Sequence, residues 1–182
     1  MSAGPTINRF RSQQVVETPW DFITAVNHEF GNIAVDLAAT DDNHKAPLWI
    51  TPEQDTFTVN WAKLLDGRLG WLNPEFDPMR KWAAKCALEQ QCGATFLMLS
   101  PASVATNWFW DSVQPYATVY CIAPRITFVG SNDPYPKDLI LSYYCASPSH
   151  ELQRWNWRES LHSAIKDIDG VPSRETHDAA DL

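Results

Sequence analysis

Apolar residues along the chain alternate between helical spacing and short continuous runs, which predicts alternating helices and strands. The first helix is expected to begin at Thr18, a good N-cap, with Pro19 at the first helical position and Gly31 at its end. Its apolar residues share a helical spacing: Phe22, Ile23, Val26 and Phe30. The next run, residues 32–37, is apolar up to Asp36 and predicts a short buried strand.

The same alternation continues through the chain, with proline and glycine between the segments. The elements predicted after the least regular stretch are a weak helix at 60–65, a strand at 68–72, a helix from 78 to 93, a strand at 96–99, a helical stretch at 103–114, and strands at 117–123, 126–129 and 139–144. A C-terminal helix that ends at Gly170 is expected to carry four residues along one face: Leu152, Trp155, Leu161 and Ile165.

This order of elements predicts an α/β fold in which helices flank a mainly parallel sheet. We expect one compact domain at residues 18–146, preceded by a flexible arm at 1–17. Residues 147–182 are expected to add a C-terminal helix and an acidic, disordered tail. Ligands of open α/β sheets bind at the carboxyl ends of the strands. The turns after Asp36 and Leu72 lie at two such ends, so we expect a ligand site there.

Composition limits how the protein could act on a partner. Its net charge is −8 and its pI is about 5.0, which argues against a protein that coats DNA by general electrostatics. A DNA-acting enzyme would need its few cations on one face, and six of them are candidates: Arg68, Arg80, Lys81, Lys85, Arg125 and Lys137. The alternative is an ordinary solvated surface of mixed charge.

The cysteines and the apolar runs indicate a cellular setting. Four cysteines form no C-x-x-C pair and have no histidine at zinc spacing, so we expect reduced, buried thiols and no metal site. No apolar run approaches the roughly 18 residues of a membrane span, and the N-terminus does not resemble a signal peptide. We therefore expect a cytosolic protein without a membrane partner.

The most informative motif is Asn73-Pro74-Glu75-Phe76, which follows an apolar run. The side-chain oxygen of Asn73 and a carbonyl of Asn73 or Pro74 are two acceptors, and Pro74 stiffens the turn that aims them. Phe76 offers a flat face on which a base can stack. Such a turn suits the amino group of an adenine drawn out of a duplex. Alternatively, Asn-Pro simply turns the chain at the end of a strand.

Together the segments of residues 18–144 resemble the phage-type DNA adenine methyltransferases, a compact family related to Dam. The residues that carry the resemblance, in order, are Thr18-Pro19, Asn27-His28-Glu29-Phe30, Val35-Asp36-Leu37-Ala38-Ala39, Trp71-Leu72-Asn73-Pro74 with Phe76, Trp82-Ala83 with Lys85-Cys86, Gly93-Ala94-Thr95, Pro101-Ala102, Trp108-Phe109, Arg125-Ile126-Thr127-Phe128-Val129-Gly130 and Pro134-Tyr135-Pro136-Lys137-Asp138.

The resemblance implies a Rossmann-like class I methyltransferase fold that uses S-adenosylmethionine to methylate the 6-amino group of a flipped adenine. It implies that Thr18 and Pro19 approach the methionine end of the cofactor. By the same resemblance Asp36, with Leu37 and Ala38, forms the cofactor-binding turn. The catalytic positions fall on Asn73, Pro74 and Phe76. The implied setting is the cytoplasm of a bacterial host, where a phage or prophage enzyme protects DNA from restriction.

Two positions depart from the family pattern. Glu75 replaces the second proline of Asn-Pro-Pro-aromatic, and it could line the base pocket, accept an amine hydrogen or point to solvent. Many methyltransferases have a Gly-rich cofactor turn, whereas this chain has Leu37-Ala38-Ala39-Thr40, so its turn must differ. Asp36 could instead be a strand-end acid that caps the next helix.

Other candidate contacts rest on residue chemistry alone. Asp55 could meet the cofactor's ribose hydroxyls or be a solvated loop acid. Arg125 and Lys137 could bind phosphates of double-stranded DNA or pair with Asp133 or Asp138, and Trp108 could stack near DNA or pack in the core. Two other functions stay open: a methyltransferase-fold binding module that has lost turnover, with Glu75 marking the loss, or a methyltransferase for a non-DNA acceptor. The target sequence and the oligomeric state are not determined.

Overall fold

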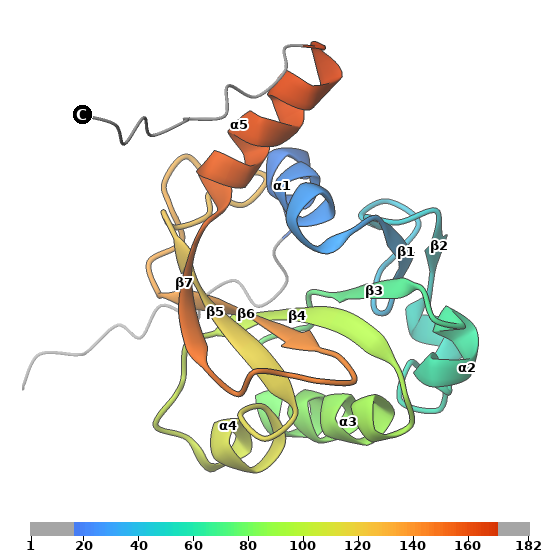
Figure 1. The fold of residues 1–182 in the computed structure, drawn as a ribbon. Helices are drawn as coiled ribbons and strands as arrows, with labels where there is room; N and C mark the ends of the chain where they lie inside the picture. The colour runs from blue at the N-terminus through green and yellow to red at the C-terminus, as the bar shows by residue number, and fades with distance from the viewer. Residues whose placement is uncertain (1–16, 171–182) are drawn as a thin grey trace, which may run out of the picture.

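The computed structural model describes residues 17–170, which form a seven-stranded sheet with helices on both faces (Figure 1). The elements in chain order are α1 (Trp20–Phe30), β1 (Ile33–Asp36), β2 (Leu48–Trp49), η1 (Pro52–Gln54), α2 (Trp61–Leu65), β3 (Leu69–Leu72), α3 (Met79–Gln91), β4 (Thr95–Pro101), α4 (Asn107–Ser112), β5 (Ala117–Ala123), β6 (Leu139–Tyr144), β7 (Leu152–Asn156) and α5 (Trp157–Ile168). The α/β class expected from the hydrophobic pattern is confirmed.

The strands are ordered β2-β1-β3-β4-β6-β5-β7 across the sheet. Strands β2, β1, β3 and β4 run parallel to one another, β6 is antiparallel to β4 and β5, and β7 is parallel to β5. The sheet is thus mainly parallel, as expected. The adjacent parallel strands β1 and β3 end side by side, because Asp36 pairs with Trp71 in the register.

Alternating residues of the central strand β4 divide the core into two clusters. Phe96 and Met98 belong to one cluster, which α2, α3 and α4 cover, and Leu97 and Leu99 belong to the other, which α1 and α5 cover. Figure 1 shows α1 and α5 together on one side of the sheet and α3 and α4 on the other. Burial on both faces explains why the strands read as apolar runs.

Two expected elements differ in the structure. The N-cap of α1 is Pro19, not Thr18, and the cap makes no side-chain hydrogen bond. Residues 126–129 form no strand, although Ile126 and Phe128 are buried. Their apolar character reflects a loop folded against the sheet. As predicted, Gly31 ends α1, with a positive φ of 102° that glycine tolerates.

The C-terminal segment is not one helix. Leu152 and Trp155 lie in β7, and only the residues from Trp157 onward are helical. Trp155 and Trp157 belong to the core cluster under α1, so β7 and α5 complete the sheet and its cover. The domain division at residue 146 stays a prediction. The expected arm and acidic tail fall mainly on residues 1–16 and 171–182, which lie outside the described residues.

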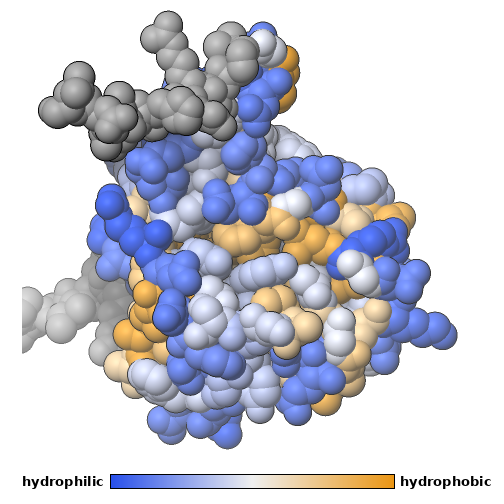
Figure 2. Space-filling view, viewed as in Figure 1, coloured by the Kyte–Doolittle hydropathy of each residue, from blue (hydrophilic) through white to orange (hydrophobic). Residues whose placement is uncertain are grey.

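The surface and the cysteines add three observations. Hydrophilic residues predominate on the face shown in Figure 2, with hydrophobic residues gathered in a band across its middle. All four cysteines are free, but only Cys86 is buried, so the expectation of buried thiols fails for Cys92, Cys121 and Cys145. Among residues 17–170, no helix has the length and apolarity needed to cross a membrane.

Candidate functional site

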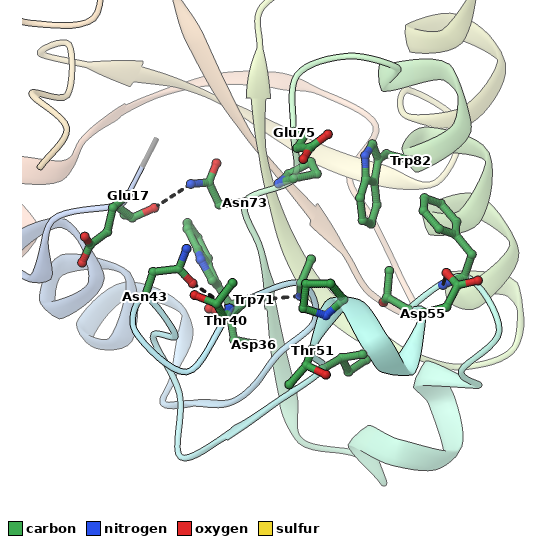
Figure 3. A pocket seen from close by; sticks show the side chains of 18 residues that line it. Glu17, Asp36, Thr40, Asn43, Thr51, Asp55, Trp71, Asn73, Glu75 and Trp82 are labelled. Carbon is green, nitrogen blue, oxygen red and sulfur yellow. Dashed lines mark hydrogen bonds between the residues drawn. The ribbon is translucent and has the colours of Figure 1, made fainter. Parts of the chain in front are cut away.

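The ends of β1 and β3 open into a pocket of about 320 Å³. The residues that line it are Glu17, Thr18, Asp36, Ala38, Ala39, Thr40, Asn43, Ile50, Thr51, Pro52, Asp55, Thr56, Phe57, Trp71, Asn73, Pro74, Glu75 and Trp82. Figure 3 shows Asn73 toward one end of this pocket and Asp55 toward the other. The pocket therefore brings together seven of the residues singled out in the sequence: Thr18, Asp36, Ala38, Asp55, Asn73, Pro74 and Glu75.

Asp36 organises the loop that follows β1. Its side chain is only 3% exposed, and its two carboxylate oxygens accept hydrogen bonds from the backbone N–H groups of Ala38 at 3.3 Å and Lys45 at 2.9 Å. Burial raises the pKa of Asp36 from 3.8 to about 6, against the lowering effect of these two hydrogen bonds and of the Lys45 charge. The alternative of a helix cap is wrong, because the carboxylate binds loop N–H groups.

Leu37 and Ala38, the next residues of the predicted cofactor turn, have different surroundings. Leu37 is fully buried in the core and does not line the pocket, whereas Ala38 does. The carbonyl of Leu37 accepts a hydrogen bond from the Thr56 hydroxyl at 2.6 Å, which joins the turn to the loop after η1. The turn is therefore held by side-chain hydrogen bonds rather than by glycine.

Thr18 contacts Asn73 directly. The Asn73 amide nitrogen donates a hydrogen bond to the Thr18 hydroxyl oxygen at 3.1 Å, and Thr18 is 1% exposed. This bond determines which end of the amide faces Thr18. Pro19, the other residue expected near the cofactor, caps α1 and is not among the pocket residues.

The predicted catalytic turn borders two cavities. Pro74 is buried and lines the first pocket together with the exposed side chain of Glu75. Phe76 instead lines a second cleft of about 390 Å³, where its ring lies 6.0 Å from the ring of Tyr135 at 73°. Glu75 thus both borders the first pocket and is exposed to solvent, and Figure 3 shows it beside Trp82.

The sequence did not predict that aromatic side chains form one wall of the pocket. The rings of Phe57 and Trp82 lie 4.4 Å apart, and the Lys81 ammonium lies 3.6 Å from the centre of the Phe57 ring. Asp55 sits at the start of this wall in a left-handed conformation, and its carboxylate accepts the Phe57 N–H at 3.2 Å. Residues 51–57 have no hydrophobic period, so no sequence signal places them against α3.

The pocket is acidic. Four carboxylate side chains line it, and none of its described lining residues is Lys, Arg or His. Those four are Glu17, Asp36, Asp55 and Glu75. Lys45 forms an ion pair with Glu17 at 2.7 Å from outside the lining, and its ammonium lies 4.7 Å from the centre of the Trp20 ring. The pocket thus disfavours phosphate groups and favours a cationic ligand.

The predicted DNA contacts separate in space. Trp108 and Lys137 line the second cleft with Phe76. Arg125 lines neither cavity and forms an ion pair with Asp138 at 2.8 Å. This is the pairing that the sequence offered as the alternative to phosphate binding.

The six candidate cations do not form a single face. The Lys85 side chain is buried in an ion pair with Glu89, so Lys85 is not available to DNA. Arg68 donates hydrogen bonds to the carbonyls of Leu64 and Leu65 at the end of α2. Within residues 17–170, no group of three or more His, Cys, Asp or Glu side chains is placed to hold a metal ion.

Together the fold and the site define an α/β protein with a pocket at the carboxyl ends of neighbouring parallel strands, where the ligands of such folds bind. A family model described as DNA N-6-adenine-methyltransferase (Dam) matches residues 8–138. The chain belongs to this family, and its fold is that of an α/β methyltransferase.

Two curated relatives match in sequence. The chain is 31% identical over 119 residues to a DNA N-6-adenine-methyltransferase of Haemophilus phage HP1 (strain HP1c1), which covers 63% of this chain and 65% of the relative. It is 24% identical over 110 residues to a DNA N-6-adenine-methyltransferase of Escherichia phage T1, which covers 60% of this chain and 45% of the relative. The match therefore spans less than two thirds of the length of either relative.

Proposed function

We propose that this protein transfers a methyl group from S-adenosylmethionine to the 6-amino group of an adenine extruded from double-stranded DNA. The observation that carries the proposal is the juxtaposition of Asn73 and Asp36 in one pocket, at the ends of adjacent parallel strands. The family, and the printed names of the two phage relatives, support the same reaction.

The charge of the pocket supports the choice of cofactor. S-adenosylmethionine carries a sulfonium cation, and four carboxylates line the pocket, of which only Glu17 forms an ion pair within residues 17–170. The other three favour such a ligand over a phosphate-bearing nucleotide. Asp36 and Ala38 would hold the cofactor beside Thr18, and Asp55 would accept hydrogen bonds from its ribose. The Phe57–Trp82 wall offers an apolar surface for its adenine ring.

The residues of the turn would prepare the adenine amine for attack. When bound, S-adenosylmethionine supplies an electrophilic methyl group. The Asn73 side-chain oxygen and the backbone carbonyl beside it accept the two amine hydrogens, which directs the nitrogen lone pair toward the first pocket. The chemistry that the cofactor would supply is methyl donation with a neutral thioether as the leaving group, and the amine nitrogen would release a proton to water. Catalysis is therefore mainly positioning.

Phe76 would support the base by stacking, and the second cleft would face the DNA. Lys137 and Trp108 are the predicted DNA contacts that line that cleft, whereas the Asp138 pair offsets the charge of Arg125. We further propose that the enzyme is encoded by a phage or prophage. It would act in the cytoplasm of the bacterial host and protect DNA from restriction.

Transfer of tritiated methyl groups to unmethylated phage and plasmid DNA tests the proposal directly, with nucleoside analysis of the product. Label in 6-methyladenine is expected. If the cofactor binds by calorimetry while no DNA is labelled, the binding module or a non-DNA acceptor replaces this proposal. Glu75, an acid at the pocket wall where the family has proline, is the observation that favours those alternatives.

Asn73→Ala is expected to lower methyl transfer by at least about a hundredfold, because the amine then loses an oriented acceptor. The fold and the cofactor affinity should stay unchanged, as measured by circular dichroism and calorimetry. The exposed Asn32, which precedes β1 at the opposite end of the strand, provides the matched control. Wild-type activity of Asn73→Ala would contradict the catalytic assignment.

A further inference from the structure

The second cleft lies against the catalytic turn. Cations and aromatic rings line it, whereas acids line the cofactor pocket. We propose that the cleft binds the strand of DNA that carries the target adenine, with Arg80 and Lys137 on phosphates and Trp108 against a base. This inference rests on the proposed function and adds to it a defined nucleic-acid site. The carrying residues come from three segments, namely the start of α3, α4 and the loop before β6.

Three aromatic side chains give the cleft a surface for bases. Phe76 and Tyr135 line it with rings 6.0 Å apart, and Trp108 lines it from α4. Tyr135 is held in place, because its N–H donates to the Ile126 carbonyl at 2.8 Å and its ring packs against Phe128 at 5.4 Å. Every nucleobase has a flat face, so such a surface accepts a single strand with little sequence preference.

Two cations complete the site. Arg80 and Lys137 are exposed and line the cleft, and neither forms an ion pair with any residue in the range 17–170. Asp77 is the one acid among the described lining residues. In a chain of net charge −8, cations without an ion-pair partner beside aromatic rings complement a phosphodiester backbone.

The position of the cleft connects it to the chemistry. Pro74 and Glu75 line the cofactor pocket, whereas Phe76, the next residue, lines the cleft. A strand in the cleft would therefore present a base at the same turn that borders the cofactor. The acidic pocket and the cationic cleft separate the two ligands by charge, because the phosphates are repelled from the pocket and attracted to the cleft.

The test compares DNA binding with methyl transfer in the full-length protein. Affinity for a fluorescein-labelled unmethylated duplex is measured by anisotropy across a salt series, without cofactor. For Arg80→Ala/Lys137→Ala we expect affinity to fall on the order of tenfold. The negative slope of log K against log salt should become less steep by about 2. Cofactor affinity, measured by calorimetry, should not change.

Matched controls come from the same chain. Lys166→Ala removes an exposed cation from α5, on the opposite side of the sheet, and should leave DNA affinity and salt slope unchanged. Trp108→Ala should weaken binding and Trp108→Phe should restore most of it, because the ring is what stacks. Trp110→Ala provides the control for that pair, since Trp110 is on the same helix but does not line the cleft.

The outcomes separate this inference from the proposed function. Wild-type affinity and salt slope in the double variant would overturn the cleft assignment, even if methyl transfer to DNA is observed. A wild-type protein that fails to bind DNA would overturn it too. If the wild type binds DNA, and the double variant shows the expected fall in affinity and the less steep salt dependence, the cleft assignment holds even when no methyl is transferred. In that case only the proposed reaction fails.

Discussion

At the scale of single residues, the catalytic turn depends on a buried neighbour that does not touch the reacting atoms in the proposed mechanism. Thr18 precedes α1, and its hydroxyl accepts a hydrogen bond from the Asn73 amide. An amide can present either its oxygen or its NH₂ group to the substrate, and only the oxygen can accept an amine hydrogen. In the proposed mechanism Thr18 is therefore a positioning residue for Asn73.

Thr18→Val keeps the side-chain volume but removes the acceptor for the Asn73 amide. We expect kcat to fall roughly tenfold to a hundredfold, with little change in the KM for S-adenosylmethionine, because the amide can then turn its NH₂ group toward the substrate. Thr18→Ser retains the hydroxyl and should keep most of the activity. Steady-state kinetics of both variants check this, and equal loss in the two would indicate a packing role only.

Asp36 is a second residue whose environment has a measurable consequence. Its raised pKa means that the folded state holds a proton over a pH range in which the unfolded state has released it. The free energy of unfolding must therefore fall as pH rises from about 3.8 to about 6, and stay lowered above that. A shift of this size corresponds to roughly 3 kcal/mol.

Asp36→Asn should remove this dependence, because the amide does not titrate. We expect the wild type to lose about 2 kcal/mol relative to the variant between pH 4 and pH 6. Urea denaturation of both proteins across this range measures the difference. Parallel curves for the two proteins would show that burial does not raise the pKa of Asp36.

At the scale of elements, the short helix α2 is held by the long helix α3. The Glu89 carboxylate accepts the N–H groups of Trp61 at 2.8 Å and Ala62 at 3.2 Å, which caps the N-terminus of α2. Lys85 pairs with Glu89 and donates to the Val59 carbonyl at 2.7 Å. These contacts fix the chain just after residues 51–57, which form one wall of the proposed cofactor pocket.

Glu89→Ala should therefore destabilise the protein by about 3 kcal/mol or more, because it leaves the Lys85 ammonium buried without its partner and removes the acceptor for the first two N–H groups of α2. Chemical denaturation gives the stability, and calorimetry should show weaker cofactor binding. Glu151 is exposed at the entry to β7, so Glu151→Ala is the control. An equally small effect of both substitutions would contradict this role of the pair.

At the scale of the whole molecule, the two ends of the described chain support each other. The helices α1 and α5 pack together over one face of the sheet (Figure 1). Trp157, at the start of α5, lies 5.3 Å from Phe22 of α1 between ring centres, and its indole N–H donates to the Pro124 carbonyl at 2.7 Å. One side chain thus joins α5, α1 and the loop after β5.

Trp157→Ala should lower the free energy of unfolding by about 3–5 kcal/mol, because it removes a 1% exposed side chain from this junction. Trp110 is 55% exposed, so Trp110→Ala should cost less than about 1 kcal/mol. Thermal and urea unfolding of the two variants compare them directly. Similar stability of both would mean that α5 is not part of the cooperative core.

The sequence alone determined most elements and the two strand-end turns. Local signals carry this information, because apolar periodicity, proline and glycine act within a few residues. The strand at 68–72 and the helix beginning near Pro78 were predictable for that reason. The same local signals misassigned residues 126–129 and 152–155, where apolar side chains are buried by contacts with distant segments.

Only the tertiary structure decided which residues share the site. Thr18 and Asn73 are 55 positions apart in the chain. The rings of Phe57 and Trp82 are in contact although α2 and β3 lie between them in the chain. Such pairs depend on strand order and helix packing, which no local pattern records. Charge is decided in the same way, because pairing buries Lys85 with Glu89 and leaves Arg80 and Lys137 exposed at the second cleft. The sequence determines which chemical groups are present, and the fold determines which of these groups lie close enough to act together.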